Sequence, residues 1–159
     1  MKKLLPLLML MLVSACTSSP PKEGGSLQSG DPAINDMTFY AMSLDGTPYR
    51  PGGEAPADGF DCSGFVQHVF DHSLGMKLPR TSREMSSLGD HIELHHLTPG
   101  DLVFFKTTSK PFSHVGIYLG ESQFIHAPRI GSSIRIENLN VGYWRARYNG
   151  ARRVSRRSL

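Results

Sequence analysis

Three residues of this chain could together form a nucleophilic catalytic site: Cys62, His114 and His126. A cysteine nucleophile needs a base nearby, and a second polar group is often needed to orient that base. Cys62 directly follows Asp61, a good N-cap residue. The apolar residues that come next recur at helical spacing, at Phe65, Val66, Val69 and Phe70. The pattern therefore predicts that Cys62 lies in the first turn of a helix.

A helix start suits a cysteine nucleophile for two reasons. The positive end of the helix dipole favours the thiolate, which is the reactive form of cysteine. Free backbone N–H groups at the same place can stabilise an oxyanion. We therefore expect Cys62 to have a lowered pKa.

The two histidines are predicted to lie on neighbouring strands, within residues 114–119 and 123–127. A hairpin centred on Gly120, with a loop of three or five residues, would place His114 directly opposite His126. Directly opposed side chains have Cβ atoms ~5 Å apart. One imidazole could then hydrogen-bond to the other and orient it.

Only one other cysteine, Cys16, is present. Cys62 could therefore be a reactive free thiol, an inert core residue, or one half of a disulfide with Cys16. Its place at a predicted helix start favours the reactive thiol.

The remaining pattern predicts helices first and short strands after them. A helix is expected over residues 32–44, a breaker-rich loop over 46–53, and a short helix that begins with the capping box Thr81 to Glu84 and ends at Gly89. Strands are expected over residues 102–105, 114–119, 123–127, 133–137 and 143–148. This order predicts an α+β domain with an antiparallel sheet.

Six ordered segments form a recognisable set. They are F-D-C-S-G-F-V at 60–66, L-T-P-G-D-L-V-F-F at 97–105, H-V-G-I-Y-L-G at 114–120 and F-I-H-A at 124–127, with G-T-P-Y-R-P-G-G at 46–53 and L-P-R-T-S at 78–82. Together these segments resemble the NlpC family of bacterial cell-wall cysteine peptidases. The resemblance implies a papain-like α+β fold, with N-terminal helices packed on an antiparallel β-sheet.

The resemblance also implies roles for individual residues. Cys62 would be the nucleophile, His114 the base and His126 the orienting group, while Tyr49 would line the oxyanion site. Residues Asp61 and Ser63 would help to hold the stem peptide of peptidoglycan. The expected substrates are amide bonds in wall stem peptides or cross-links, and no metal or other cofactor is expected.

The N-terminus is typical of a bacterial lipoprotein. Lys2 and Lys3 precede the apolar residues 4–13, a run too short to span a bilayer, which needs ~20 residues. The small residues before Cys16 resemble a lipobox, which implies a signal peptide at 1–15 and fatty acylation of Cys16. Residues 16–33 would be the lipidated N-terminus and a flexible tether, and 34–159 the catalytic domain. By resemblance to enterobacterial lipoprotein sorting, Thr17 rather than Asp after Cys16 implies the periplasmic face of the outer membrane.

The charge pattern disfavours nucleic acid as a partner. The net charge is +3, but acidic residues outnumber basic ones between Cys16 and Trp144, and six arginines gather at 145–159. This basic C-terminal tail is either a contact for anionic lipid or wall polymer, or a solvated strand end. We expect a monomer, anchored to the membrane by lipid, that binds stem peptides.

The histidines at His91, His95 and His96 could suggest a metal site, but no cysteine or clear carboxylate partner is nearby. A solvated loop is the better interpretation. Three other functions stay open: a wall-binding lipoprotein without catalysis, an amidase or acyltransferase acting on another substrate, and a structural envelope protein.

Overall fold

The computed structural model describes residues 30–159 of the chain. The helices are α1 (Pro32–Ser43), α2 (Cys62–Leu74), α3 (Ser82–Met85) and α4 (Gly142–Arg145), with 3₁₀ turns η1 (Leu94–His96) and η2 (Arg156–Ser158). The strands are β1 (Glu54–Ala55), β2 (Gly59–Phe60), β3 (Asp90–Ile92), β4 (Leu102–Phe105), β5 (His114–Gly120), β6 (Gln123–His126), β7 (Arg135–Asn138) and β8 (Tyr148–Arg153).

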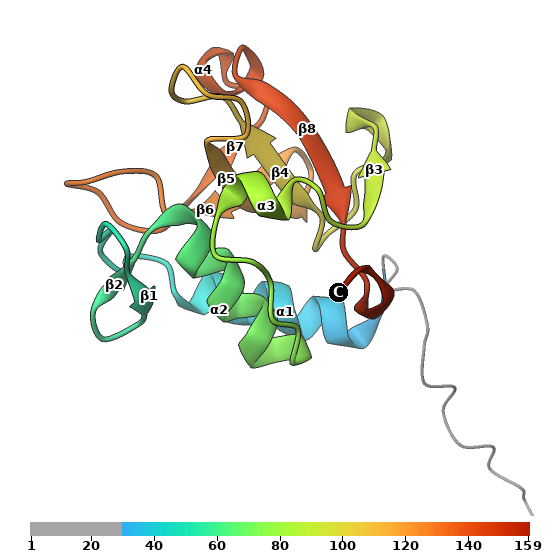
Figure 1. Ribbon diagram of the computed structural model, residues 1–159, viewed down its shortest axis with the longest axis horizontal. Helices are drawn as coiled ribbons and strands as arrows, with labels where there is room; N and C mark the ends of the chain where they lie inside the picture. Colours follow the sequence, from blue (N-terminus) through green and yellow to red (C-terminus); the bar gives the residue numbers. More distant parts are fainter. Residues whose placement is uncertain (1–29) are drawn as a thin grey trace, which may run out of the picture.

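The main sheet is antiparallel, with strand order β3-β8-β4-β5-β6-β7. Figure 1 shows α1 and α2 together on one side of this sheet, with the small β1–β2 hairpin beside the start of α2. The α+β architecture expected from the sequence is confirmed.

The sheet buries a different apolar cluster on each of its faces. The helix face includes Val115, Ile117 and Ile125 of the sheet with Phe65, Val66 and Val69 of α2. The opposite face includes Phe105, Phe124 and Trp144, the last of which comes from α4. Alternation along β5 and β6 assigns successive side chains to these two clusters, and the histidines share the face of Trp144.

The start of α2 is fixed by its cap and by a glycine. The Asp61 side chain accepts a hydrogen bond from the Gly64 N–H at 2.7 Å, as the sequence predicted for an N-cap. A Cβ on Gly64 would lie 2.1 Å from the Gly53 carbonyl oxygen, so no larger residue fits between the helix and the loop before it. These contacts hold the first turn of α2, and Cys62 with it, against the 46–53 loop.

The β5–β6 hairpin differs from its prediction in register. Ile117 pairs with Ile125, and the turn is the two-residue Glu121–Ser122, both at positive φ (50° and 61°). A loop of three or five residues centred on Gly120 was therefore wrong, because the two residues after Gly120 adopt the left-handed conformations that such tight turns require. The two histidines are offset by two residues rather than directly opposed, and an offset of two keeps both on one face.

The short helix at Thr81 begins as predicted, with the Glu84 N–H bonded to the Thr81 hydroxyl, but it ends at Met85, four residues before Gly89. One further segment was assigned wrongly. Part of the expected strand at 143–148 is α4, because Trp144 turns into the second core, and β8 begins only at Tyr148. The segment 91–96 is solvent-exposed at its three histidines, as expected, but it includes the end of β3 and the η1 turn rather than irregular loop alone.

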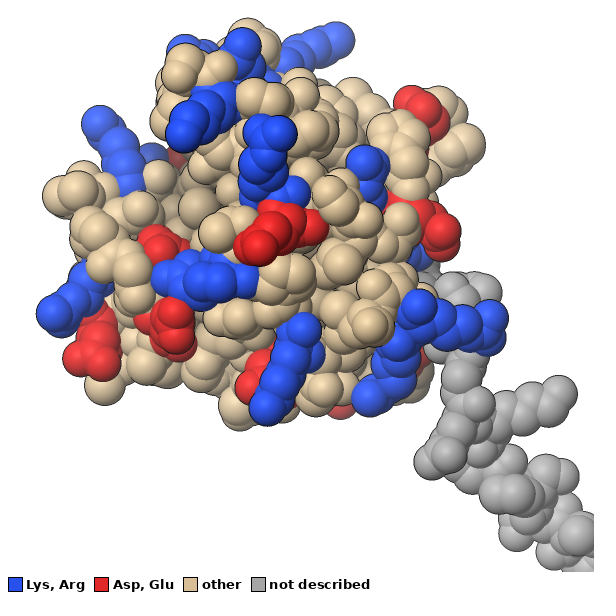
Figure 2. Space-filling view, in the orientation of Figure 1, with Lys and Arg blue, Asp and Glu red and all other residues tan. Residues whose placement is uncertain are grey.

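The C-terminal arginines do not form a free tail. Arg153 is hydrogen-bonded to both carboxylate oxygens of the buried Asp101 at 2.8 Å, and Arg156 donates to the Leu74 carbonyl. Figure 2 shows basic side chains spread between the α4 end of the molecule and the region of η2. Arg153 and Arg156 are therefore bonded to groups inside the folded domain.

Cys16, the signal peptide and most of the proposed tether lie outside the described residues. Within residues 30–159, no helix is both long and apolar enough to cross a membrane. The same residues contain no group of three or more His, Cys, Asp or Glu side chains arranged to hold a metal ion.

Candidate active site

Cys62 is the first residue of α2 and lies against the start of β5. It is a free thiol that is partly exposed. The backbone N–H groups of Cys62, Ser63 and Val115 are directed at its sulfur. Because Val115 immediately follows His114 in β5, the helix start and the base proposed from the sequence meet at one place.

The two histidines form one buried unit. His114 Nε2 lies 2.7 Å from His126 Nδ1, within hydrogen-bond distance, and the two side chains are 4% and 0% exposed. A Cβ on Gly116 would lie 3.2 Å from the His126 Cβ and 2.9 Å from the Ile125 carbonyl oxygen. Glycine at 116 therefore gives His126 the space to reach diagonally across the hairpin to His114.

Aromatic rings enclose this histidine pair. The Trp144 ring stacks on His114 with an interplanar angle of 25° and a centroid separation of 5.7 Å. The same indole meets His126 edge-on at 4.8 Å, and Phe105 and Phe124 complete the surround. The packing fixes both ring planes and excludes water from between them.

Burial sets the charge state of the pair. Desolvation holds the pKa of His114 well below 6.5, and it also lowers the pKa of His126. Both imidazoles are therefore neutral near pH 7. A neutral His114 keeps a lone pair available to accept a proton, which is the state that a general base needs.

The expectation of a lowered pKa at Cys62 was wrong for the resting site. Burial of the sulfur, with a smaller contribution from the Asp61 carboxylate, raises the pKa of Cys62 to about 11. The N–H groups of Cys62 and Ser63 at the helix start and of Val115 in β5 act in the opposite direction but do not outweigh desolvation. The resting site is thus a neutral thiol beside a neutral imidazole, and the sulfur must lose its proton as it reacts.

Tyr49 lies near the sulfur, as the sequence motif implied. It is partly buried, and burial raises its pKa, with further contributions from Cys62 and Asp61. Its N–H donates to the Ser132 carbonyl at 2.8 Å, which ties the 46–53 loop to the segment between β6 and β7. The phenol therefore stays protonated and can donate a hydrogen bond near the thiol.

Asp61 and Ser63 are engaged inside the protein. Asp61 accepts hydrogen bonds from the backbone of Gly52 and Gly64, and Arg80 pairs with both of its oxygens at 3.0 and 2.7 Å. The Ser63 hydroxyl lies 2.9 Å from Arg80 Nη1. These contacts leave Asp61 little free acceptor capacity for a ligand.

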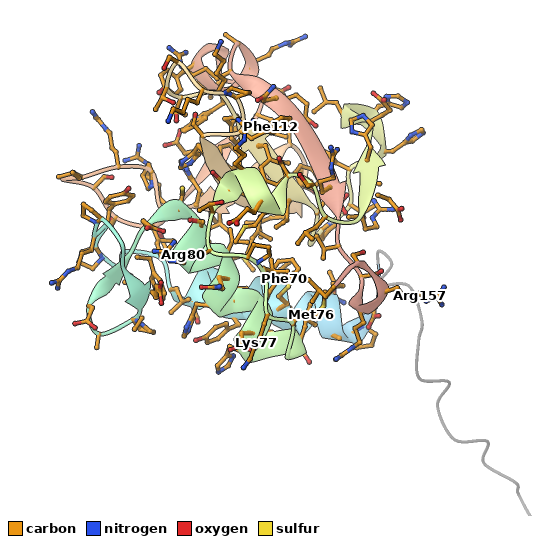
Figure 3. The ribbon with its side chains drawn as sticks, in the orientation of Figure 1. Phe70, Met76, Lys77, Arg80, Phe112 and Arg157 are labelled. Carbon is orange, nitrogen blue, oxygen red and sulfur yellow. The ribbon has the colours of Figure 1, made fainter. Side chains whose placement is uncertain are left out.

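Sequence reasoning did not identify Arg80 as a site residue, although its motif was noted. Figure 3 shows Arg80 beside the start of α2, on the side of β1 and β2. It bridges Asp61 and Glu54, and its side chain is 34% exposed. Arg80 is therefore the more accessible member of the polar cluster next to Cys62.

Sequence reasoning also missed Glu137, which lies behind His126. Its Oε1 is 3.6 Å from His126 Nε2 and 2.6 Å from Arg135 Nε, and its Oε2 accepts from the Trp144 indole N–H. The signal available was the alternation in β7, which puts Arg135 and Glu137 on one face, but only the β6–β7 register shows that His126 shares it.

The other histidines lie elsewhere. His91 contacts Glu93 and Arg152, and the exposed His95 and His96 rings lie 4.0 Å apart in η1. His68 bonds to the Tyr40 hydroxyl at 2.8 Å between α1 and α2. None of them reaches Cys62.

A cysteine at the start of a helix that packs on a sheet, beside the strand that begins with a histidine, is consistent with a papain-like fold. Residues 46–153 match the model of the NlpC/P60 family. This match spans more than half of the chain, so the chain belongs to the NlpC/P60 family.

Similar curated proteins include three from Escherichia coli. Murein DD-endopeptidase MepH is 46% identical over 71% of this chain and 43% of its own length, and Murein DD-endopeptidase MepS/Murein LD-carboxypeptidase is 45% identical over 71% and 58%. "Probable endopeptidase NlpC" is 37% identical over 97% of this chain and all of its own length. The chain therefore spans less than two thirds of MepH and MepS but the whole of the third relative.

Solved structures agree on the fold. An NlpC/P60 family protein from Bacillus cereus has a TM-score of 0.72 at 35% identity, covering 77% of this chain and 40% of its own. The NlpC/P60 domain of the peptidoglycan hydrolase SagA has a TM-score of 0.65 at 34% identity, covering 77% and 97%. The papain-like fold expected from the sequence is confirmed.

Proposed function

We propose that this protein is a cysteine endopeptidase that hydrolyses amide bonds in peptidoglycan stem peptides or cross-links. The observation that carries the proposal is the buried His114–His126 pair, 2.7 Å apart, at the strand end that packs on the Cys62 helix start. Several relatives are named murein endopeptidases, which supports the same class of substrate.

The first step is attack of the Cys62 sulfur on the substrate carbonyl carbon. His114 Nε2 is engaged by His126, so the proton acceptor is the other ring nitrogen, Nδ1. Because the thiol and the imidazole are both neutral at rest, His114 takes the thiol proton as the carbon–sulfur bond forms.

The negative charge that develops on the carbonyl oxygen needs hydrogen-bond donors. We assign this role to the Cys62 N–H at the start of α2 and to the Tyr49 hydroxyl. Collapse of the tetrahedral intermediate breaks the C–N bond, and His114 gives its proton to the leaving amine. Water, activated by the same ring, then releases the acyl group from Cys62.

The polar cluster beside Cys62 is assigned to substrate binding. Asp61 and Ser63, the two neighbours of Cys62 in the chain, hold Arg80, whose side chain is partly exposed. Arg80 would thereby contact a carboxylate or carbonyl of the stem peptide, with Asp61 and Ser63 acting through it.

The direct test is digestion of purified sacculi and of defined muropeptides, followed by mass spectrometry of the products. The expected result is new fragments that arise by amide hydrolysis and are missing when Cys62→Ala protein is used. Wild-type protein that binds sacculi but releases no such fragments over a long incubation would favour a non-catalytic wall-binding role. Cleavage of other amides or acyl transfer, with no muropeptide cleavage, would favour an amidase or acyltransferase that acts on another substrate.

We also propose that acylated Cys16 anchors the domain at the periplasmic face of the outer membrane and that the domain is monomeric. The apolar residues 4–13 and the small residues before Cys16 support this location. Incorporation of labelled palmitate into wild-type protein, and its loss in Cys16→Ala, would test the anchor. Equal labelling of the two proteins would disprove it, and sedimentation of the soluble domain would test the oligomeric state.

A further inference from the structure

His126 has a second ring nitrogen that the catalytic pair does not use. Nδ1 faces His114, whereas Nε2 is buried and has no partner within direct hydrogen-bond distance among the described residues. The nearest acceptor is Glu137 Oε1 at 3.6 Å, beyond the ~3.2 Å limit of a direct N–H···O bond. Such contacts are often long in ligand-free enzymes and shorten in the substrate complex.

Glu137 is held in place and kept ionised. The Trp144 indole N–H donates to Oε2, and Arg135 Nε donates to Oε1 at 2.6 Å. The contact with His126, followed by the hydrogen bonds from Trp144 and Arg135, lowers the pKa of Glu137 to about 2, so the group is a carboxylate at any pH at which the protein would work. A carboxylate can only accept hydrogen bonds.

An acceptor at this position selects one tautomer of His126. The proton of the neutral ring is favoured on Nε2, where it faces the carboxylate, which leaves Nδ1 as an acceptor. His114 must then carry its own proton on Nε2 to donate to His126, which leaves a free lone pair on its Nδ1. Both rings therefore carry their proton on Nε2 and have an unprotonated Nδ1.

We propose that Glu137 is a positioning residue that fixes the tautomers of His126 and His114, so that Nδ1 of His114 is the proton acceptor for Cys62. This inference rests on the proposed function and adds to it a fourth residue, from β7. Trp144 serves the same arrangement, because it holds the Glu137 carboxylate and stacks on His114.

The substitution Glu137→Gln tests the proposal with almost no change in shape. If the amide oxygen keeps the Trp144 bond, the amide NH₂ lies where Oε1 was and donates toward His126 Nε2, which selects the opposite tautomer. If the amide turns over, its NH₂ opposes the indole N–H and that bond is lost. In neither arrangement does residue 137 accept a hydrogen bond from Trp144 and also present an acceptor to His126 Nε2.

Kinetics on a defined muropeptide provide the first measurement. We expect Glu137→Gln to lower kcat by about 10- to 100-fold, the range found when a carboxylate that orients a functional histidine is removed, while KM changes by less than about threefold. The matched control is Glu121→Gln, an exposed carboxylate in the β5–β6 turn, which should leave both constants unchanged. A Glu137→Gln enzyme with wild-type kcat overturns the proposal.

Nitrogen NMR of histidine-labelled full-length domain provides the second measurement, and it needs no substrate. In the wild type we expect both His114 and His126 to be protonated on Nε2 and not on Nδ1. In Glu137→Gln we expect this state of His126 to be lost or mixed. A wild-type His126 protonated on Nδ1 overturns the proposal even if the protein is an active peptidase. The expected tautomers in a protein that cleaves no muropeptide would support the positioning role and reject only the proposed function.

Discussion

The two sides of the candidate site differ in polarity and in exposure to solvent. The helix side holds Cys62 beside a partly exposed network of Asp61, Ser63 and Arg80. The strand side holds His114 and His126 among buried aromatic rings, with Glu137 behind them. The partly exposed Arg80 on the helix side can bind a ligand. The two histidines on the strand side are buried, and packing fixes their orientation. Under the proposed mechanism, substrate recognition would lie at the start of α2 and proton transfer would lie in the sheet.

Both sides nevertheless favour neutral groups at rest. Burial raises the pKa of Cys62 and lowers that of His114, so no thiolate–imidazolium pair forms before the substrate arrives. Desolvation is the main cause of both shifts.

The largest effect is expected on the helix side, for Cys62→Ala. Loss of the nucleophile should lower kcat on muropeptides by at least about 10⁴-fold. The melting temperature should change little, because the side chain is small and partly exposed. Steady-state turnover and thermal unfolding measure the two quantities. Residual activity within tenfold of wild type would reject Cys62 as the nucleophile.

The strand side should show the next largest effect, for His126→Ala. This change removes the acceptor of His114 Nε2 and leaves a gap under Trp144, so we expect kcat to fall by about 10²- to 10⁴-fold. His126→Gln is the matched control, because its amide oxygen can accept the same hydrogen bond and should restore part of the rate. Equal rates for the two variants would mean that the hydrogen bond does not matter.

The pH dependence tests whether the resting site is neutral on both sides. Because the pKa of His114 is lowered, its basic form persists to lower pH, so the acid limb of kcat/KM should lie below pH 6.5. The raised pKa of Cys62, about 11, predicts that alkylation by iodoacetamide accelerates with pH up to that value. An alkylation rate that is already independent of pH between 6 and 9 would show a preformed thiolate instead.

The comparison also explains which parts of the site the sequence revealed. Asp61, Cys62 and the helical spacing after them are adjacent in the chain, so local rules were enough to place Cys62, the proposed nucleophile, at a helix start. The histidines needed only the right face of a hairpin, and a register error of two residues preserved that face.

Glu137 and Arg80 required information that is not local. Glu137 meets His126 through the β6–β7 register, and Arg80 meets Asp61 from a different part of the chain, beyond the end of α2. The pKa of Cys62 was also beyond local reasoning, because a helix dipole can be read from a sequence but the burial of one sulfur cannot. Trp144 was assigned to a strand for a related reason: its place under the sheet depends on tertiary packing that outweighs local β-propensity.

The smallest effect is expected for Arg80→Met, which keeps an unbranched apolar side chain and removes the guanidinium with its charge. An ion pair that is one third exposed contributes at most about 1 kcal/mol, so the fold should persist with a small drop in melting temperature. Asp61 then lacks its main neutralising partner, and its charge, which already raises the pKa of Cys62, should slow alkylation of the thiol at pH 8 by a few-fold. If Arg80 also contacts substrate, KM should rise more than kcat falls. Arg83→Met, an exposed arginine on α3, is the matched control and should change neither measurement. If KM and the alkylation rate are both unchanged in Arg80→Met, Arg80 contributes only a surface ion pair. Substrate recognition would then depend on other residues of the helix side.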